Sequence, residues 1–390
     1  MFSLKNTVAG VLSCTMLLGS LVISGCSDSN TSGTQSADNT SNGSSTAHQG
    51  EIKDISSVEL VKDMKIGWSL GNTLDGGNES NRGQDPGSIE KSWGNPDTTK
   101  EMIDEIKKAG FNVLRVPTTW DWSTGEAPEY KISDEWFARV KEIVDYGMEN
   151  DMYVILNIHH ETWHDPLEKN YEAASDRLKK VWTQIGNYFK DYDEHLIFEG
   201  LNEPRVRNSD EEWNGGSDAT REVVNKLDAD FVSTIRSLDG NNKLRHLMIP
   251  GYAASSSEVA LKALKIPEND DKLIVSVHAY IPYNFALADN KRSNKWVACK
   301  EGFTNDIDNL ADMLKTLFTD KGQAVIIGEF GARSKDNEKY RAEWAKYYVT
   351  KMKTVGVPCV WWDNGAFIGS GELFGLFDRR NLEWRYPLVK

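Results

Sequence analysis

The stretch Ile197-Phe198-Glu199-Gly200-Leu201-Asn202-Glu203-Pro204 decides how the chain is interpreted. Its apolar run is typical of a buried strand, and it ends abruptly in Asn-Glu-Pro. Pro204 lacks a backbone N–H and stops the strand, so we expect the Glu203 carboxylate at the mouth of a sheet. A second stretch repeats the pattern: Ala324-Val325-Ile326-Ile327-Gly328-Glu329-Phe330-Gly331.

Glu203 and Glu329 therefore each end a predicted strand, 126 positions apart (329 − 203). Either glutamate alone is equally well explained as an ordinary surface carboxylate. Hydrolysis of a glycosidic bond requires a carboxyl group that protonates the leaving oxygen and a second carboxylate that attacks. The pair therefore predicts a glycosidase site.

Strand and helix patterns alternate from residue 51 onward. Strands are predicted at 65–72, 111–117, 153–160, 195–203, 247–250, 273–278, 324–329 and 357–363. Helical apolar spacing is found between them, at 100–109, 133–150, 172–189, 220–238, 305–318 and 338–354, with a short helix after the fifth strand. Eight such units predict a single α/β domain with a (β/α)8 TIM barrel. The alternative is an open doubly wound sheet, but Ser69-Leu70-Gly71-Asn72-Thr73 fits no phosphate-binding turn.

The C-terminus departs from the barrel pattern. Only Tyr386-Pro387-Leu388-Val389-Lys390 remains where an eighth helix would follow, so we predict a short or truncated helix there. The first and last strands would then lack their usual cover. Our hypothesis is that residues 55–64, apolar at 55, 58, 60, 61 and 64, supply part of it.

The first fifty residues indicate export. Lys5 and the apolar run 8–23 are typical of a signal peptide, and Ile23-Ser24-Gly25-Cys26 resembles a bacterial lipoprotein box. That resemblance implies a signal peptide at 1–25, acylation of Cys26 and attachment to a membrane by lipid. Residues 26–50 form a flexible Ser/Thr/Asn/Gly tether, which leaves 51–390 as the catalytic domain. We expect a secreted, cell-surface or outer-membrane lipoprotein of a bacterium.

Composition narrows the function. The net charge of −14 argues against nucleic-acid binding, and 13 Trp residues provide aromatic faces that either fill the core or stack on sugars. The chain has no Cys-x-x-Cys and no His-x-His, so we predict no metal site and no cofactor. Cys299 and Cys359 remain in the mature domain, and the sequence leaves open whether they pair. We expect a monomer.

Seven of the eight predicted strands end in a polar or aromatic residue, and in a barrel the carboxyl ends of the strands carry the chemistry. Besides the two glutamates these residues are Asn72, Arg115, His159, His160, Asn202, His278, Tyr280 and Trp362.

These residue types suggest roles. Arg115 can keep the attacking carboxylate ionised, and Asn202 can donate to a sugar 2-hydroxyl. His278 and Tyr280 are two positions apart, so both can orient a carboxylate. Trp362 offers a stacking platform. The neighbouring histidines after strand three would point to opposite faces of an ideal strand, so we expect only one to line the site unless the strand bends.

Several motifs together resemble glycoside hydrolase family 5, most closely its subfamily 4 of endo-β-1,4-glucanases. They are 66–75, Trp93-Gly94-Asn95-Pro96, Arg115-Val116-Pro117, Asn157-Ile158-His159-His160, Asn202-Glu203-Pro204, His278-Ala279-Tyr280, Gly328-Glu329-Phe330-Gly331 and 361–365. The resemblance implies a retaining mechanism with Glu203 as acid/base and Glu329 as nucleophile. It also implies that Arg115, His159, Asn202, His278, Tyr280 and Trp362, and more loosely Asn72 and His160, line the −1 subsite.

We therefore expect a retaining endo-β-1,4-glucanase that cleaves xyloglucan, mixed-linkage glucan or cellulose, with a slight preference for the first two. The insertions 76–92 and 205–217 are expected to shape the groove. The alternatives are a mannanase or xylanase, and a non-catalytic glycan-binding lipoprotein on the same barrel. A metal-dependent hydrolase built on His159, His160, His278 and Glu329 is a third alternative.

Overall fold

The structure is a computed structural model that describes residues 48–289, 293–369 and 371–390. The signal peptide predicted at 1–25, the acylation site Cys26 and the tether up to residue 47 lie outside the described residues. Within the part that is described, no helix has both the length and the apolar character needed to cross a membrane.

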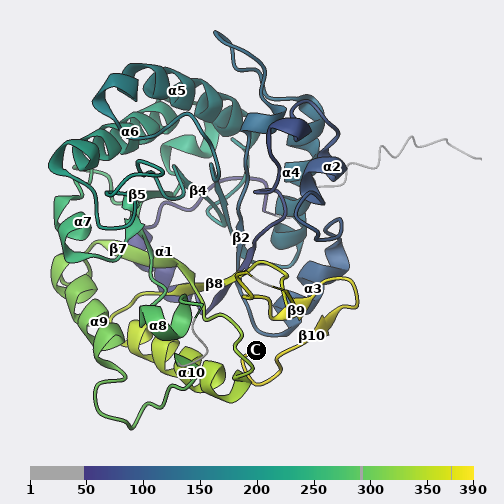
Figure 1. Cartoon of the computed structure of the whole chain (residues 1–390). Helices are drawn as coiled ribbons and strands as arrows, with labels where there is room; N and C mark the ends of the chain where they lie inside the picture. Colours follow the sequence, from purple (N-terminus) through teal and green to yellow (C-terminus); the bar gives the residue numbers. More distant parts are fainter. Residues whose placement is uncertain (1–47, 290–292, 370) are drawn as a thin grey trace, which may run out of the picture. The chain divides into compact units, whose positions relative to one another are not determined.

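Eight parallel strands close into one barrel in sequence order (Figure 1). They are β1 (Gly67–Leu70), β2 (Val113–Val116), β3 (Tyr153–Asn157), β4 (Leu196–Glu199), β5 (Leu247–Ser255), β6 (Leu273–His278), β7 (Ala324–Phe330) and β8 (Cys359–Asp363). Pairing of β1 with β8 completes the ring. The prediction of a (β/α)8 barrel is confirmed, and the open doubly wound sheet is wrong.

Helices surround the barrel and bury their apolar faces on it. They are α2 (Pro86–Glu90), α3 (Lys100–Lys108), α4 (Asp134–Glu149), α5 (Tyr171–Tyr188), α6 (Asp218–Ser237), α7 (Glu258–Ala263), α8 (Tyr283–Ala286), α9 (Asn305–Leu317) and α10 (Glu338–Thr354). The short helices α2 and α8 lie in loops and were not predicted, because four or five residues show no apolar period. Ser133 caps α4 by accepting from the Trp136 N–H, as its position before the apolar run indicates.

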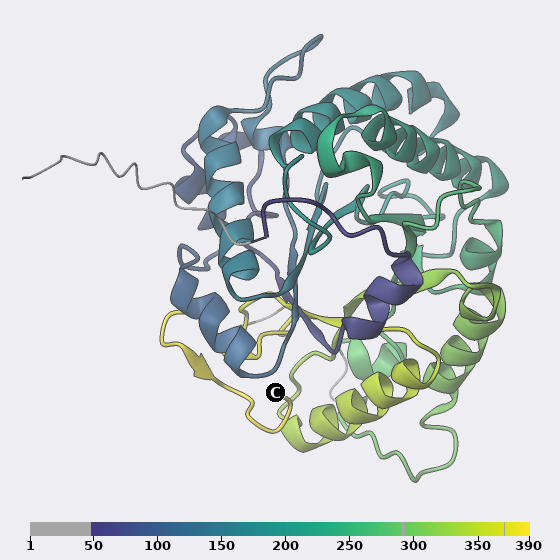
Figure 2. The ribbon, with the colours of Figure 1, turned by 180° about the vertical axis from the view of Figure 1, so that it is seen from behind.

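Helix α1 (Ser57–Asp63) closes the N-terminal end of the barrel. Ser56 and Glu59 form a capping box that starts it. Leu60 is fully buried, and with Val61 and Met64 it packs against barrel residues from seven strands: Val113, Tyr153, Ile155, Ile197, Met248, Ile274, Ala324, Ile326 and Val360. Figure 2 shows this segment crossing the barrel end opposite to the view of Figure 1. The hypothesis that residues 55–64 cover the outside of the first and last strands is wrong, because they seal the barrel floor.

The outer cover comes instead from the C-terminal segment, which lies between α3 and α10 in Figure 1. Its two short antiparallel strands are β9 (Phe377–Asp378) and β10 (Glu383–Trp384). Trp384 stacks on Phe111 with ring centroids 5.8 Å apart, and Phe377 is fully buried. The predicted stub of an eighth helix is a hydrogen-bonded turn in which Val389 N–H donates to the Tyr386 carbonyl over 3.0 Å.

The first described residues pair with a loop of the barrel. Residues 48–50, placed at the end of the tether by the sequence, pair with the loop before β4: Gln49 bridges to Tyr192, and Asp193 N–H donates to the His48 carbonyl over 2.9 Å.

Cys299 is exposed and Cys359 is buried in β8, and both are free thiols.

Candidate active site

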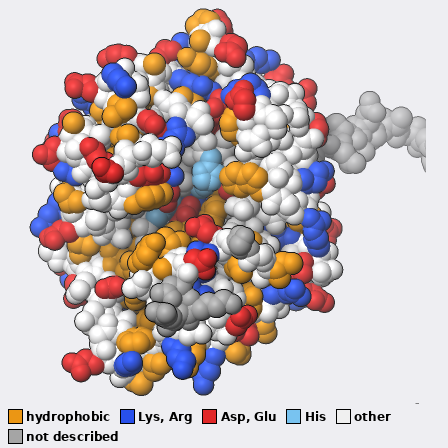
Figure 3. Space-filling model, viewed as in Figure 1, with side chains coloured by type: hydrophobic (Ala, Val, Ile, Leu, Met, Phe, Trp, Pro, Cys, Tyr) orange, Lys and Arg blue, Asp and Glu red, His pale blue; other side chains and the backbone are white. Residues whose placement is uncertain are grey.

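The predicted site residues gather at the carboxyl ends of the strands. Figure 3 shows a hollow at the centre of this face, with histidine and acidic side chains on its floor and apolar side chains at its sides. Gly71 lies where β1 leaves the barrel, and a Cβ there would come within 2.8 Å of the Trp362 ring. Only glycine therefore lets the β1 exit pass beside Trp362.

Glu329, near the end of β7, is held at both carboxylate oxygens. Arg115 Nη1 donates to Oε1 over 2.7 Å, and the Tyr280 hydroxyl donates to Oε2 over 2.7 Å. Burial, reinforced by the Glu329 charge, raises the pKa of Tyr280 well above its ordinary value, so the hydroxyl keeps its proton. A carboxylate clamped by two donors is oriented for attack in one direction.

Arg115 also ties the site to the barrel interior. Its Nε donates to Glu199 Oε2 over 2.8 Å, and its Nη2 donates to Asn202 Oδ1 over 2.7 Å. That bond uses the amide oxygen of Asn202 and leaves its Nδ2 as the group that can donate to a sugar hydroxyl. Burial alone would raise the pKa of Glu199, but the Arg115 charge together with His278 and the Ser276 hydroxyl outweighs it and lowers the pKa to about 2.

Glu203, just beyond β4, binds a different partner. His278 Nδ1 lies 2.8 Å from Glu203 Oε1, and Arg205 Nη1 lies 3.3 Å from Glu203 Oε2. Burial opposes a charge on His278, yet Glu329, Glu199 and Glu203 raise its pKa to about 9. His278 is therefore a cation at neutral pH and donates to Glu203, and it holds the pKa of that carboxyl below its usual range against the effect of burial.

The two carboxylates are close and their charges are balanced. An oxygen of Glu203 and an oxygen of Glu329 lie within 4.8 Å of each other, and His278 Nδ1 is 3.7 Å from Glu329 Oε2. His278 and Tyr280 thus orient two different glutamates, whereas the sequence suggested a shared one. Three cations (Arg115, Arg205, His278) face three carboxylates (Glu199, Glu203, Glu329), so the charges within this set balance.

Both histidines after β3 lie on the same side of the site. The strand ends at Asn157, so strict alternation no longer applies to His159 and His160. The His159 ring stacks on Trp362 with centroids 5.7 Å apart and planes 4° apart, and it meets His160 edge-on at 4.3 Å. His160 is partly exposed beside Trp93, whose ring centroid is 5.5 Å away.

Asn72 lies at the exit of β1 in a left-handed backbone conformation, with φ of 55°. Its N–H donates to Asp75, and its carbonyl accepts from Asn95. Among the described residues, its side chain makes no hydrogen bond to another predicted site residue. Its contacts therefore fix the backbone at the exit of β1 and do not tie its side chain to the two glutamates.

Three residues of the site were missed in the sequence. Glu199 reads as part of the apolar strand, although a charge in such a run signals a buried ion pair. Arg205 follows Pro204 directly, and its guanidinium lies over the Trp213 ring, 4.2 Å from the centroid. Trp213 is 63% exposed, so much of its ring is open to solvent beside Arg205.

The four residues proposed for a metal-dependent hydrolase do not converge. Within the described part of the chain, His159 and His160 group with Asp75, while His278 groups with Glu203 and Glu329. Each His278 and Glu329 contact above is a hydrogen bond or ion pair within a charge-balanced set. The geometry favours the two-carboxylate chemistry.

The barrel brings two glutamates together at its strand ends. Glu203 lies beside two cations, and Glu329 is held by Arg115 and Tyr280. This arrangement defines a glycoside hydrolase. The model of the cellulase family, glycosyl hydrolase family 5, matches residues 77–367. The chain belongs to this family, which confirms the resemblance found in the sequence.

The relatives agree with this assignment. Endoglucanase B of Neocallimastix patriciarum is 49% identical over 340 residues, which cover 86% of this chain and 71% of that protein. Endoglucanase A of Ruminococcus albus is 45% identical over 343 residues, covering 87% and 92%. A GH5-4 broad specificity endoglucanase from Ruminococcus champanellensis, solved with bound cellotriose, is 43% identical with a TM-score of 0.81, covering 87% and 98%. A GH5 family lichenase from Caldicellulosiruptor sp. F32 is 43% identical with a TM-score of 0.82, covering 87% and 95%.

Proposed function

We propose that the protein is an endo-β-1,4-glucanase that cleaves internal bonds of β-glucans with retention of anomeric configuration. The observation that carries the stereochemical part is the approach of Glu203 and Glu329 oxygens to within 4.8 Å. Retaining glycosidases hold their two carboxyl groups about 5–5.5 Å apart, whereas inverting enzymes leave about 6.5–9.5 Å for a water molecule.

In the first step Glu329 attacks the anomeric carbon, a glycosyl ester forms, and the bond to the leaving glucan breaks. The leaving oxygen takes a proton from Glu203. In the free protein that proton lies on His278, whose Nδ1 is 2.8 Å from Glu203, and it moves along this hydrogen bond as the sugar displaces water. Asn202 Nδ2 donates to the sugar 2-hydroxyl, a contact that strengthens as positive charge develops on the ring.

In the second step Glu203 acts as a base. It takes a proton from water, the water oxygen bonds to the anomeric carbon, and the ester to Glu329 breaks. Arg115 and Tyr280 stabilise the Glu329 carboxylate as it departs, because both donors already face its oxygens.

The substrate is a β-glucan with an accessible backbone, with xyloglucan and mixed-linkage glucan preferred over crystalline cellulose. Exposed aromatic rings support this choice. Trp213, in the 205–217 insertion, packs against Arg205, which pairs with Glu203, and we expect its exposed ring to stack on the leaving part of the glucan. Trp93, 41% exposed beside His160, follows the 76–92 insertion. Relatives named as a broad specificity endoglucanase and a lichenase also support a range of β-glucans.

Product analysis on a panel of polysaccharides tests this proposal. We expect xyloglucan and barley-type glucan to lose viscosity before reducing ends accumulate, with slower attack on carboxymethyl cellulose and little on mannan. NMR of the first products should show the β-anomer before mutarotation. First appearance of the α-anomer would exclude retention, and faster cleavage of mannan or xylan than of any glucan would exclude the glucanase assignment.

We also propose that the enzyme is a monomeric lipoprotein at a bacterial cell surface, acylated on Cys26. The motif Ile23-Ser24-Gly25-Cys26 after an apolar run supports acylation, and one chain supplies every described site residue. In a bacterial host the wild type should incorporate labelled palmitate and sediment with membranes. Cys26→Ala should lose both, with unchanged kcat on a soluble glucan, while labelling that survives this change would contradict the proposal.

A further inference from the structure

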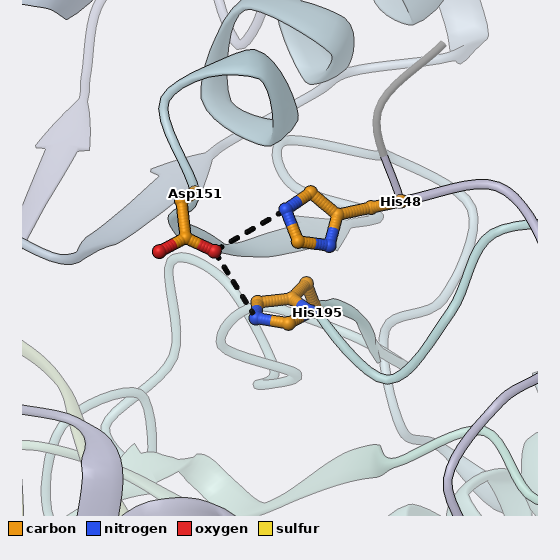
Figure 4. A group of neighbouring side chains, drawn as sticks. All are labelled: His48, Asp151 and His195. Carbon is orange, nitrogen blue, oxygen red and sulfur yellow. Dashed lines mark ion pairs between the residues drawn. The ribbon is translucent and has the colours of Figure 1, made fainter. Parts of the chain in front are cut away.

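A cluster of two histidines and an aspartate lies at the opposite end of the barrel from the catalytic glutamates. Figure 4 shows His48, Asp151 and His195 facing one another. Asp151 precedes β3, His195 precedes β4, and His48 lies in the segment that pairs with the loop before β4. The three residues come from three separate parts of the sequence, so no local spacing motif indicates that they lie together.

The ring nitrogens that face Asp151 are the Nε2 atoms. His48 Nε2 lies 3.3 Å from Asp151 Oδ1, and His195 Nε2 lies 3.9 Å from the same oxygen. The two imidazole rings are 4.1 Å apart at their centroids. One oxygen and two nitrogens thus converge, and one ligand atom from each residue lies within 4.8 Å of the others.

The other ring nitrogens are bound by a single carboxylate. Asp193 Oδ2 is 2.8 Å from His48 Nδ1, and Asp193 Oδ1 is 3.0 Å from His195 Nδ1. Asp193 therefore fixes both histidines in the tautomer with the proton on Nδ1 and the lone pair on Nε2. Metal-binding histidines typically have this arrangement, a carboxylate on the far nitrogen that sets the ring orientation.

The surroundings keep the two histidines in place. The Tyr153 ring stacks on His195 at 4.7 Å, and Asp193 N–H donates to the His48 carbonyl. Both imidazoles are mostly buried, at 18% and 14% side-chain exposure, whereas the Asp151 side chain is 77% exposed. Solvent therefore reaches the Asp151 side of the cluster, which leaves room for a water ligand.

We propose that His48 Nε2, His195 Nε2 and Asp151 Oδ1 bind a divalent ion of the zinc class, with water in the fourth position. Zinc–ligand bonds of about 2.0–2.2 Å require ligand atoms roughly 3.4 Å apart in a tetrahedron. The 3.3 Å separation meets this already, and the 3.9 Å separation closes with a shift of the exposed Asp151 side chain. The ion would fasten the chain at residue 48 to the loops before β3 and β4.

Zinc titration of the full chain after EDTA treatment tests this proposal. We expect one high-affinity ion per chain by calorimetry and a rise in Tm of about 3 °C at hundredfold excess over Kd. Co²⁺ in place of zinc should give the visible absorption of a four-coordinate site with nitrogen ligands. Hydrolysis of an aryl cellobioside should not change with zinc at this stoichiometry, because the cluster is remote from Glu203 and Glu329.

Variants assign the ion to this cluster. Asp151→Asn and His48→Asn should each weaken zinc binding at least tenfold, and Asp193→Asn by about 10–100-fold through loss of histidine orientation. Asp151 is too exposed for its replacement to unfold the barrel. Asp191→Asn removes the same charge from a neighbouring exposed residue that faces Lys190, and it should bind zinc as the wild type does. Absence of binding, or an unchanged Kd in both Asp151→Asn and His48→Asn, would overturn the proposal.

Discussion

Replacing Glu329 with Ala is expected to lower kcat on every β-glucan by roughly 10⁶-fold, the scale seen when a catalytic nucleophile is lost. Arg115 and Tyr280 would then face an empty position, and no other described carboxylate is held by both. Binding of cellotriose should persist, because Asn202, His159 and Trp362 remain. Steady-state kinetics and calorimetry on the same preparation separate the two effects.

Azide distinguishes loss of a nucleophile from loss of folding. In Glu329→Ala the small anion can enter the vacated space and attack an activated cellobioside, which should restore turnover and give the α-cellobiosyl azide. Glu372→Gln is the matched control: it removes a carboxylate whose charge acts on Glu203 and Glu329 but which makes no hydrogen bond to either, so we expect less than a tenfold change. A β-azide product would assign the nucleophile elsewhere.

Replacing Glu203 with Ala should have an effect that depends on the leaving group. On polysaccharide we expect kcat/KM to fall by about 10³- to 10⁴-fold, the upper range for a general acid. On 2,4-dinitrophenyl cellobioside the first step needs no proton, so the glycosyl ester on Glu329 should form quickly and accumulate. A burst of dinitrophenol, and a mass increase on the peptide that contains Glu329, would report that ester.

Azide should also rescue Glu203→Ala, but through the second step. It attacks the glycosyl ester on the face left by Glu203 and should give the β-cellobiosyl azide, the opposite anomer to that from Glu329→Ala. Glu212→Gln is a useful comparison, because Glu212 pairs with the Arg205 Nε at 3.1 Å and does not contact Glu203. Equal losses on polysaccharide and on the activated substrate would refute the acid/base role.

The barrel and its two glutamates were predictable because the local sequence shows where each strand ends. Pro204 stops the strand of Glu203, and the apolar run before Glu329 breaks in the same way. In a closed parallel barrel those ends must share one face, so local patterns determine a long-range juxtaposition. The position of α1 was not predictable in this way. Its apolar stripe indicates that it packs against an apolar surface, but not that this surface is the floor of the barrel.

The hydrogen-bond partners of the site residues were harder to predict than the positions of these residues. His278 and Tyr280 were expected to serve one carboxylate, yet each donates to a different one, since β6 ends at His278 and the chain turns after it. Glu199 was missed because its neighbours are all apolar. The histidine cluster at His48 was missed because Asp151 and His195 lie 103 and 147 positions after His48 along the chain (151 − 48 and 195 − 48).

The position of residue 48 has a consequence for how a polymer can lie across the site. The described chain begins beside the loop before β4, on the rim that carries the amino ends of the strands, while Glu203 and Glu329 lie on the other rim. Residue 48 therefore lies behind the catalytic face. A polymer that extends across the cleft therefore does not have to pass the point at which the described chain begins.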